Sequence, residues 1–260
     1  MASPFRRRVN PARVVPERIQ KLLANHGIAS RRRIEGWIRE GRLDVNGHKA
    51  RLGDRAESTD HFKLDGKLLS LKSRASQKTG RVLILDKPLG IICSRSDPQG
   101  RQSVFDLLPK IRAGRWISVG RLDINTSGLL LFSDDGELVA RLMHPKYRLR
   151  RVYHCRIDGN PDDVQLQRLQ SGIDIAGNVC LFEQIRSLGG KGRNRRFEVS
   201  LSEGRNREVR RLWEAIGFKV SRLRRVAYGP VRLPARLASG SCIELAESEL
   251  SRLYRAVNLA

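Results

Sequence analysis

Residues 120–131 read Gly-Arg-Leu-Asp-Ile-Asn-Thr-Ser-Gly-Leu-Leu-Leu, and they join a loop of small polar residues to an apolar run. The run at 129–132 predicts a buried strand, and the shorter apolar run at 116–119 predicts another before the loop. Asp123 lies on the loop between them, so its carboxylate would sit at the edge of a rigid sheet, where reactive side chains are common. Alternatively, Asp123 could simply hydrogen-bond the backbone of its own turn.

The sequence on either side of this segment predicts a mixed α+β domain with a sizeable sheet. Strand-like runs alternate with stretches in which apolar residues recur at helical spacing. The predicted strands are 82–85, 129–132, 153–157 and 197–201, and the predicted helices include 138–143 and 164–169.

The first part of the chain predicts a separate compact unit at 16–71. Apolar residues at i, i+3 and i+4 indicate two short amphipathic helices, which Gly27 and Gly41 are placed to end. The pairs Asn46-Gly47 and Asp65-Gly66 each follow a short strand-like run, at 43–45 and 62–64, and such pairs favour tight hairpins. We therefore expect a helix-helix-hairpin unit. It would be preceded by a basic disordered arm at 1–15 and followed by a polar linker at 72–80.

Charge indicates a polyanionic partner. The chain has 51 Lys and Arg against 27 Asp and Glu, a formal charge of +24, and nucleic acid is the first expectation. A membrane surface is disfavoured because the basic residues are spread over many segments rather than one helix face. Ser30 can cap the second helix, whose first turn then carries three arginines against the helix dipole. An external anion would relieve this conflict, so we expect RNA phosphates at Lys21, Arg31, Arg32 and Arg33, although a solvated charge run remains the alternative.

Several classes of site are not indicated. The four cysteines are far apart and the five histidines never fall at metal-ligand spacing, so neither disulfides nor a metal are expected. The sequence shows neither a signal peptide nor a membrane span, which predicts a cytoplasmic protein; the Arg-rich start also fits an organelle transit peptide. We further expect a monomer.

Arg210 has an unusual place on the predicted helix after Gly204. Val209, Leu212, Trp213 and Ile216 form an apolar stripe, with charged residues opposite. Arg210 lies at the border between the two faces and can lean inward. A guanidinium there would supply a fixed positive charge to a partly buried carboxylate.

Longer segments resemble known families. Residues 18–32, Arg-Ile-Gln-Lys-Leu-Leu-Ala-Asn-His-Gly-Ile-Ala-Ser-Arg-Arg, followed by Gly-Arg-Leu-Asp-Val-Asn-Gly at 41–47, resemble the small alpha-L RNA-binding domain, which also occurs in tyrosyl-tRNA synthetases and a small-subunit ribosomal protein. Residues 120–131, with Asp-Gly-Glu-Leu at 135–138 and Leu-Met-His-Pro at 142–145, resemble the signature of bacterial rRNA pseudouridine synthases of the RsuA and RluB group.

The second resemblance continues over residues 17–250. Upstream are Lys-Pro-Leu-Gly at 87–90, Asp-Pro-Gln-Gly-Arg at 97–101 and Val-Phe-Asp-Leu-Leu-Pro at 104–109. Downstream, Leu-Ser-Glu-Gly-Arg-Asn-Arg-Glu-Val-Arg-Arg-Leu-Trp-Glu-Ala at 201–215 and Val-Ser-Arg-Leu at 220–223 are most similar to the large-subunit subtype. The resemblance implies a catalytic domain at 81–260, built on a mostly antiparallel mixed sheet with flanking helices.

The resemblance also implies roles for individual residues. Asp123 would be the essential residue that acts on the ribosyl carbon or base of a uridine, Tyr153 would face the flipped base, and Arg210 would pair with the aspartate. Lys87, Arg121, Arg205, Asn206 and Arg207 would contact RNA. A cluster at Lys191, Arg193, Arg195 and Arg196 is as easily a solvated loop.

The implied reaction needs no cofactor. The implied substrate is 23S rRNA, with the pseudouridine at position 2605 as the leading target and another large-subunit uridine or the small-subunit rRNA as alternatives. A non-catalytic RNA assembly factor on the same scaffold is a second hypothesis, disfavoured because a binding-only protein would not need the trio Asp123, Tyr153 and Arg210. A DNA-binding protein is a third, disfavoured because neither N-terminal helix is evidently a recognition helix.

Overall fold

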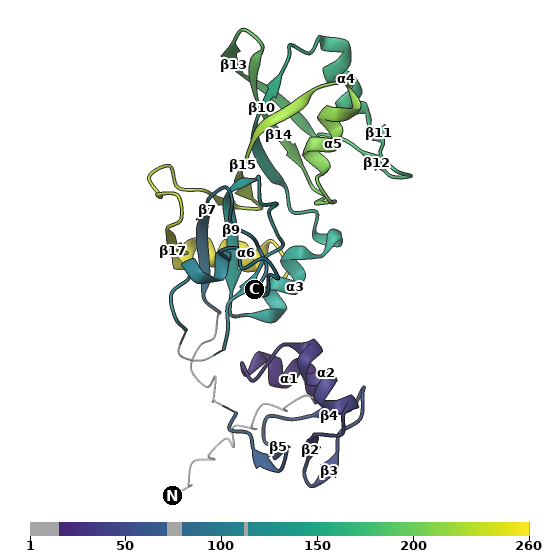
Figure 1. The fold of residues 1–260 in the computed structure, drawn as a ribbon, viewed down its shortest axis with the longest axis vertical. Helices are drawn as coiled ribbons and strands as arrows, with labels where there is room; N and C mark the ends of the chain where they lie inside the picture. The colour runs from purple at the N-terminus through teal and green to yellow at the C-terminus, as the bar shows by residue number, and fades with distance from the viewer. Residues whose placement is uncertain (1–15, 72–79, 112–113, 260) are drawn as a thin grey trace, which may run out of the picture. The chain divides into compact units, whose positions relative to one another are not determined.

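The computed structural model describes residues 16–71, 80–111 and 114–259 (Figure 1). The predicted basic arm at 1–15 lies outside the described residues, as does all of the predicted linker except Gly80. The described residues form two compact units, one of residues 16–71 with 111 and 114–115, and one of residues 80–110 with 116–259.

The smaller unit has two helices and short antiparallel strands, as its local patterns predict. The helices are α1 (Ile19–Asn25) and α2 (Arg31–Arg39). One sheet has the order β3-β2-β5-β6, and β1 pairs with β4. The strand bounds are β1 Glu17–Arg18, β2 Leu43–Val45, β3 His48–Lys49, β4 Arg55–Ala56, β5 Phe62–Leu64 and β6 Lys67–Leu68.

Turn residues determine where these elements end. Asn46 and Gly47 both have positive φ (51° and 87°), which the tight hairpin between β2 and β3 requires. Asp65 and Gly66 do the same between β5 and β6. The Ser30 hydroxyl accepts a hydrogen bond from the Arg33 backbone N–H at 3.2 Å, so the predicted cap of α2 is confirmed.

The larger unit is built on a nine-stranded sheet with the order β13-β14-β10-β15-β9-β7-β17, on which β8 pairs with β9 and β16 with β15. All its neighbouring strands are antiparallel except β9 and β15, so the expected α+β fold with a mostly antiparallel mixed sheet is confirmed. The bounds are β7 Val82–Lys87, β8 Ile117–Ser118, β9 Ser127–Ser133, β10 Arg151–Asp158, β13 Gln184–Lys191, β14 Asn194–Leu201, β15 Lys219–Tyr228, β16 Val231–Arg232 and β17 Cys242–Glu244.

Helices flank this sheet in two groups. In Figure 1, α3 (Gly136–Met143) and α6 (Glu247–Arg255) lie by β7 and β9, whereas α4 (Asp163–Ser171) and α5 (Glu208–Ala215) lie by β10, β14 and β15. Short 3-10 helices at Val104–Leu107 and Pro145–Tyr147 and a two-stranded sheet, β11 (Ile173–Asp174) with β12 (Val179–Cys180), complete the unit. No helix of the described residues is long and apolar enough to cross a membrane.

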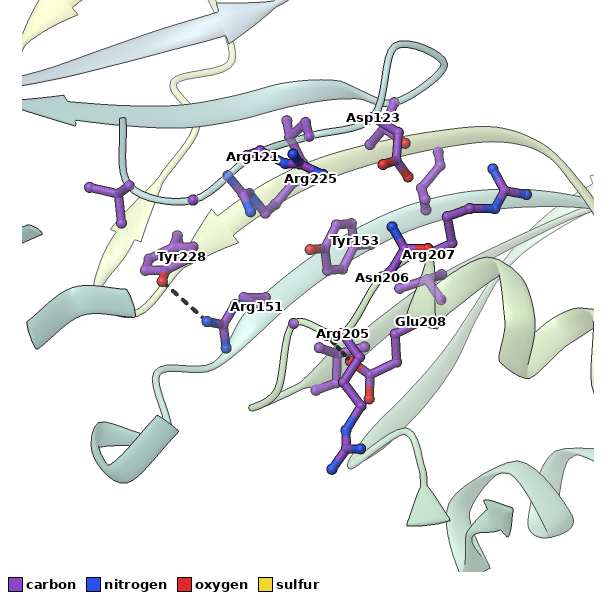
Figure 2. A pocket seen from close by; sticks show the side chains of 18 of the residues that line it. Arg121, Asp123, Arg151, Tyr153, Arg205, Asn206, Arg207, Glu208, Arg225 and Tyr228 are labelled. Carbon is purple, nitrogen blue, oxygen red and sulfur yellow. Dashed lines mark hydrogen bonds between the residues drawn. The ribbon is translucent and has the colours of Figure 1, made fainter. Parts of the chain in front are cut away.

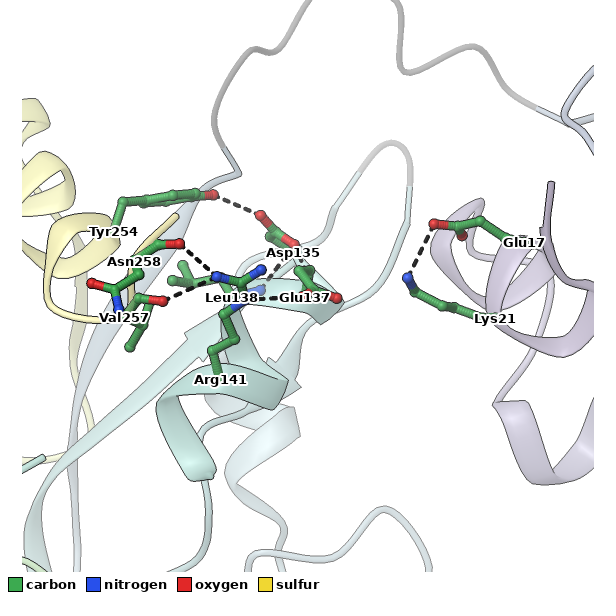
Figure 3. A network of polar contacts seen from close by, with 9 residues as sticks. All are labelled: Glu17, Lys21, Asp135, Glu137, Leu138, Arg141, Tyr254, Val257 and Asn258. Carbon is green, nitrogen blue, oxygen red and sulfur yellow. Dashed lines mark hydrogen bonds and ion pairs between the residues drawn. The ribbon is translucent and has the colours of Figure 1, made fainter. Parts of the chain in front are cut away.

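A polar network ties α6 to α3 (Figure 3). The Tyr254 hydroxyl donates to Asp135 Oδ2 at 2.7 Å and accepts from the Gly80 N–H at 2.8 Å. Arg141 of α3 donates to the carbonyl oxygens of Val257 and Asn258 just beyond α6. Because these carbonyls end a helix, the arginine satisfies groups that the helix itself cannot pair.

The join between β9 and β15 positions the loop that carries Asp123. Only two residue pairs form this parallel contact, Ser127 with Arg224 and Gly128 with Arg225. A Cβ on Gly128 would lie 2.2 Å from the Arg225 carbonyl oxygen, and its φ is 101°, so glycine is required for the two backbones to approach. Residues 120–126 therefore enter β9 where the two halves of the sheet meet.

Candidate active site

A pocket of about 390 Å³ lies beside the Asp123 loop (Figure 2). Its size is in the range of small-ligand sites. Most of its lining comes from four parts of the larger unit: the loop before β9, strand β10, strand β15 and the segment at the start of α5. The residues that line it are Val119, Gly120, Arg121, Leu122, Asp123, Thr126, Met143, Arg151, Tyr153, Leu201, Gly204, Arg205, Asn206, Arg207, Glu208, Val209, Leu223, Arg225 and Tyr228.

The carboxylate of Asp123 faces this pocket. Its backbone carbonyl accepts the turn hydrogen bond from the Thr126 N–H at 3.0 Å, but no side-chain hydrogen bond or ion pair joins it to any other described residue. The side chain is half-buried. Asp123 therefore does not cap its own turn, and a carboxylate without a partner is available to a ligand.

Tyr153 forms part of the wall beside Asp123. It lies on β10, is 8% exposed, and its ring borders the pocket (Figure 2). A planar aromatic surface in a pocket can replace the stacking that a nucleobase loses when it leaves a helix. The structure thus brings the predicted tyrosine and aspartate together.

Arg210 lies behind the loop instead of lining the pocket. Its guanidinium donates to the Asn125 carbonyl at 2.8 Å and to the Val220 carbonyl at 2.7 Å. The expected ion pair with Asp123 is not formed among the described residues, although the carboxylate's charge acts on Arg210 over a longer distance. Burial lowers the pKa of Arg210. The arginine thus holds the loop through its backbone.

Lys87 corrects one expectation. We expected it to contact RNA, but its side chain is fully buried at the end of β7. Its ammonium donates to the carbonyls of Pro88 and Thr126, both at 2.9 Å. Burial lowers the pKa of Lys87, while Cys93 and Asp123, in their ionised forms, oppose this shift. Lys87 therefore holds the Asp123 loop through the Thr126 carbonyl and is closed to a phosphate.

Exposed basic side chains border the pocket. Arg121, Arg205 and Arg207 are exposed, as is Asn206, and all four line it. Arg205 pairs with Glu203 at 2.5 Å and Arg207 with Glu214 at 3.6 Å, so both are partly neutralised. In the smaller unit, Arg31, Arg32 and Arg33 are exposed on the first turn of α2, and Lys21 pairs with Glu17 at 3.0 Å (Figure 3).

The pocket also contains polar residues that were not predicted as site residues from the sequence, among them Arg151, Arg225 and Tyr228. Two guanidinium groups lie near the Tyr228 ring, with the Cζ atoms of Arg151 and Arg225 at 5.0 and 5.1 Å from its centroid. The sequence does contain an indication that Arg225 is buried. In the alternating pattern of strand β15 it falls in phase with Leu223 and Ala227, so its side chain is expected on the same buried face as theirs. Its neighbours Arg222 and Arg224 make the run look simply solvent-exposed.

The fold is that of a pseudouridylate synthase. A crystal structure described as a pseudouridylate synthase superposes with a TM-score of 0.63 at 26% identity, covering 91% of this chain and 99% of that one. The chain belongs to the RNA pseudouridylate synthase family, whose sequence model matches residues 81–215, and an S4 domain model matches residues 17–62.

Curated relatives are about half identical to the chain over the regions that align. Proteins named ribosomal large subunit pseudouridine synthase B are 47% identical in Pseudomonas aeruginosa, 51% in Yersinia pestis and 49% in Escherichia coli K12. The matches cover 96%, 88% and 94% of this chain, respectively. They span 65%, 72% and 84% of the relatives' own lengths.

Proposed function

We propose that the chain isomerises a uridine of large-subunit rRNA to pseudouridine. In this reaction the N1–C1′ bond breaks, a C5–C1′ bond forms, C5 loses its proton and N1 gains one. The names of the relatives support the large subunit as substrate. The net charge of +24 supports a polyanionic substrate.

The observation that carries this proposal is the unpartnered carboxylate of Asp123 in the pocket. A nucleophile must be close to its target and free of competing partners. Asp123 meets both conditions because the backbone, and not the carboxylate, fixes its turn. In our account it attacks the ribosyl carbon or the base of the extruded uridine.

Tyr153 and Arg210 assist this group in different ways. Tyr153 stacks on the extruded base, which must leave its helix before the glycosidic bond can be reached. Arg210 acts as a positioning residue, since its hydrogen bond to the Asn125 carbonyl fixes the loop two residues beyond Asp123.

RNA affinity comes from two surfaces in this account. The exposed Arg121, Arg205, Asn206 and Arg207 hold the phosphates around the target nucleotide. In the unit at 16–71, Arg31, Arg32 and Arg33 of α2 bind a more distant part of the RNA, with Lys21 alongside in the same unit. We further propose that the protein acts as a monomer in the cytoplasm, on the uridine at position 2605 of 23S rRNA.

Mapping of pseudouridines on protein-free transcripts tests this function. Large- and small-subunit rRNA transcripts are incubated separately with the wild type and with Asp123→Asn, and pseudouridines are located by chemical probing. We expect one new pseudouridine, in the large-subunit transcript at position 2605, and none with the variant. Modification of the small-subunit transcript would refute the substrate. Binding by both proteins without any modification would favour an assembly factor.

A further inference from the structure

Arg225 is a buried cation in the wall of the pocket. It lies on β15 and is 3% exposed. Across the sheet it is the direct neighbour of Tyr153 on β10 and of Gly128 on β9. Because antiparallel cross-strand partners project from the same face of a sheet, the guanidinium lies on the side of the Tyr153 ring. Figure 2 shows both side chains bordering the same pocket.

The hydrogen bonds of this guanidinium are incomplete. Nε donates to the Leu129 carbonyl at 2.8 Å, which fixes the plane of the group. Nη2 is buried and has no partner, and among the described residues no carboxylate forms an ion pair with Arg225. The Tyr228 ring, 5.1 Å from Cζ, offers only a cation–π contact.

Such an arrangement is costly for the free protein. A buried charged donor without an acceptor loses the hydration it has in water and gains little in return. The side chain cannot readily withdraw, because the Leu129 carbonyl holds Nε and the close β9–β15 contact at Gly128 fixes its backbone. A buried donor of this kind, kept in a pocket, points to a ligand that supplies the acceptor.

We propose that Arg225 donates a hydrogen bond to a carbonyl oxygen of the target uracil, and that this bond strengthens as the base detaches. The inference rests on the proposed function. A base carbonyl fits better than a phosphate, because Arg225 lies in the sheet beside Tyr153 whereas the exposed Arg121, Arg205 and Arg207 are accessible to the backbone.

The chemistry of the reaction explains the strengthening. When the N1–C1′ bond breaks with its electron pair on N1, negative charge spreads to O2 and O4 of the ring. A fixed guanidinium then stabilises this charge without reorganising. C5 then bonds to C1′ and loses its proton, and N1 gains a proton. The uracil ring of the product is therefore neutral, and Arg225 is chemically unchanged. Arg225 is thus a catalytic residue, and its role in stabilising charge on the base differs from that of Asp123.

A cycle of enzyme and substrate changes tests the proposal. Short RNAs carry uridine, 2-thiouridine or 4-thiouridine at the target, since sulfur accepts hydrogen bonds more weakly than oxygen. The single-turnover rate is measured with the wild type, with Arg225→Met and with Arg222→Met, an exposed arginine on the same strand. We expect Arg225→Met to slow uridine conversion by about 10- to 100-fold, and Arg222→Met to leave it unchanged.

The cycle distinguishes the base from other ligands. With the wild type, one of the two thio-substitutions should slow the reaction, and Arg225→Met should abolish that penalty. The proposal would be overturned if thio-substitution slowed both proteins equally, or if neither thio-substitution slowed the wild type. Circular dichroism shows whether Arg225→Met folds. If it does not fold, the wild-type comparison still tests the proposal. A variant that only weakens the salt dependence of binding would indicate a phosphate contact instead. If the wild type converts no uridine at all, the proposed function has failed.

Discussion

Arg210 Nη2 donates to the carbonyl oxygen of Asn125 at 2.8 Å, and through this bond helix α5 holds the loop of Asp123. The same guanidinium binds the Val220 carbonyl on β15, so three segments of the chain meet at one side chain. At the next residue of the loop, the Lys87 ammonium donates to the Thr126 carbonyl. Two buried cations thus fix consecutive carbonyls of the loop, while the carboxylate remains free.

Arg210→Lys should impair the reaction without impairing RNA binding. A lysine keeps the charge but loses the planar fork that reaches both carbonyls, so the loop shifts. Misplacement of a reacting group by about 1 Å can cost about 100-fold in rate, and we expect a fall in kcat of that order with an unchanged Kd for RNA. Arg211→Lys, next on the helix, is the control. Equal kcat for wild type and Arg210→Lys would show that the loop does not need this bond.

Lys87 should give stability a distinctive pH dependence. Burial lowers its pKa in the folded protein, whereas in the unfolded chain its pKa is about 10.4. Between these two values the unfolded chain binds more protons, so this lysine makes the folded state more stable as pH rises. The free energy of unfolding of Lys87→Met minus that of wild type should therefore fall as the pH rises toward the unfolded-state pKa of about 10.4. Urea titrations measure it, and a constant difference would contradict the assignment.

Tyr153→Ala and Tyr153→Phe should separate stacking from other roles of the ring. Base–aromatic stacking contributes about 1–3 kcal/mol, so Ala should weaken binding of a target RNA whereas Phe should preserve it. Both changes are made in the Asp123→Asn background, so that conversion does not disturb the titration. Equal weakening by the two substitutions would mean that the hydroxyl, and not the ring face, holds the RNA.

The first turn of α2 should contribute to RNA affinity through phosphates. Replacing Arg31, Arg32 and Arg33 by Gln should weaken binding and reduce the slope of log K against log salt by roughly 0.7–0.9 per lost contact. The rate on a saturating short substrate should stay the same, because these side chains lie in the smaller unit. Arg39→Gln, at the other end of α2, provides the matched control. An unchanged slope would refute the role given to this helix turn.

Local patterns predicted much of the fold. The hairpins at Asn46 and Asp65 followed from turn residues that accept positive φ, and the helix after Gly204 followed from its apolar stripe. Asp123 and Tyr153 were predicted from the resemblance of long segments, and the structure places both at one pocket.

The errors arose where burial depends on distant packing. Every residue of β7 is buried, including Lys87, because the strand lies inside the sheet, and a lysine at the end of an apolar run does not reveal this. Arg210 was expected to form an ion pair with Asp123, but its guanidinium donates to the backbone carbonyls of Asn125 and Val220. These carbonyls lie near Arg210 only in the folded chain. Arg225 was overlooked because its run of arginines hides one buried position among exposed ones.

The most direct test of the central claim is the release of the C5 hydrogen. Large-subunit rRNA transcribed with uridine tritiated at C5 loses one tritium to water for each pseudouridine formed, since C5 exchanges its hydrogen for the bond to C1′. We expect the wild type to release about one equivalent per transcript and Asp123→Asn to release none while binding equally well. Release of tritium by Asp123→Asn at the wild-type rate would contradict the role of Asp123.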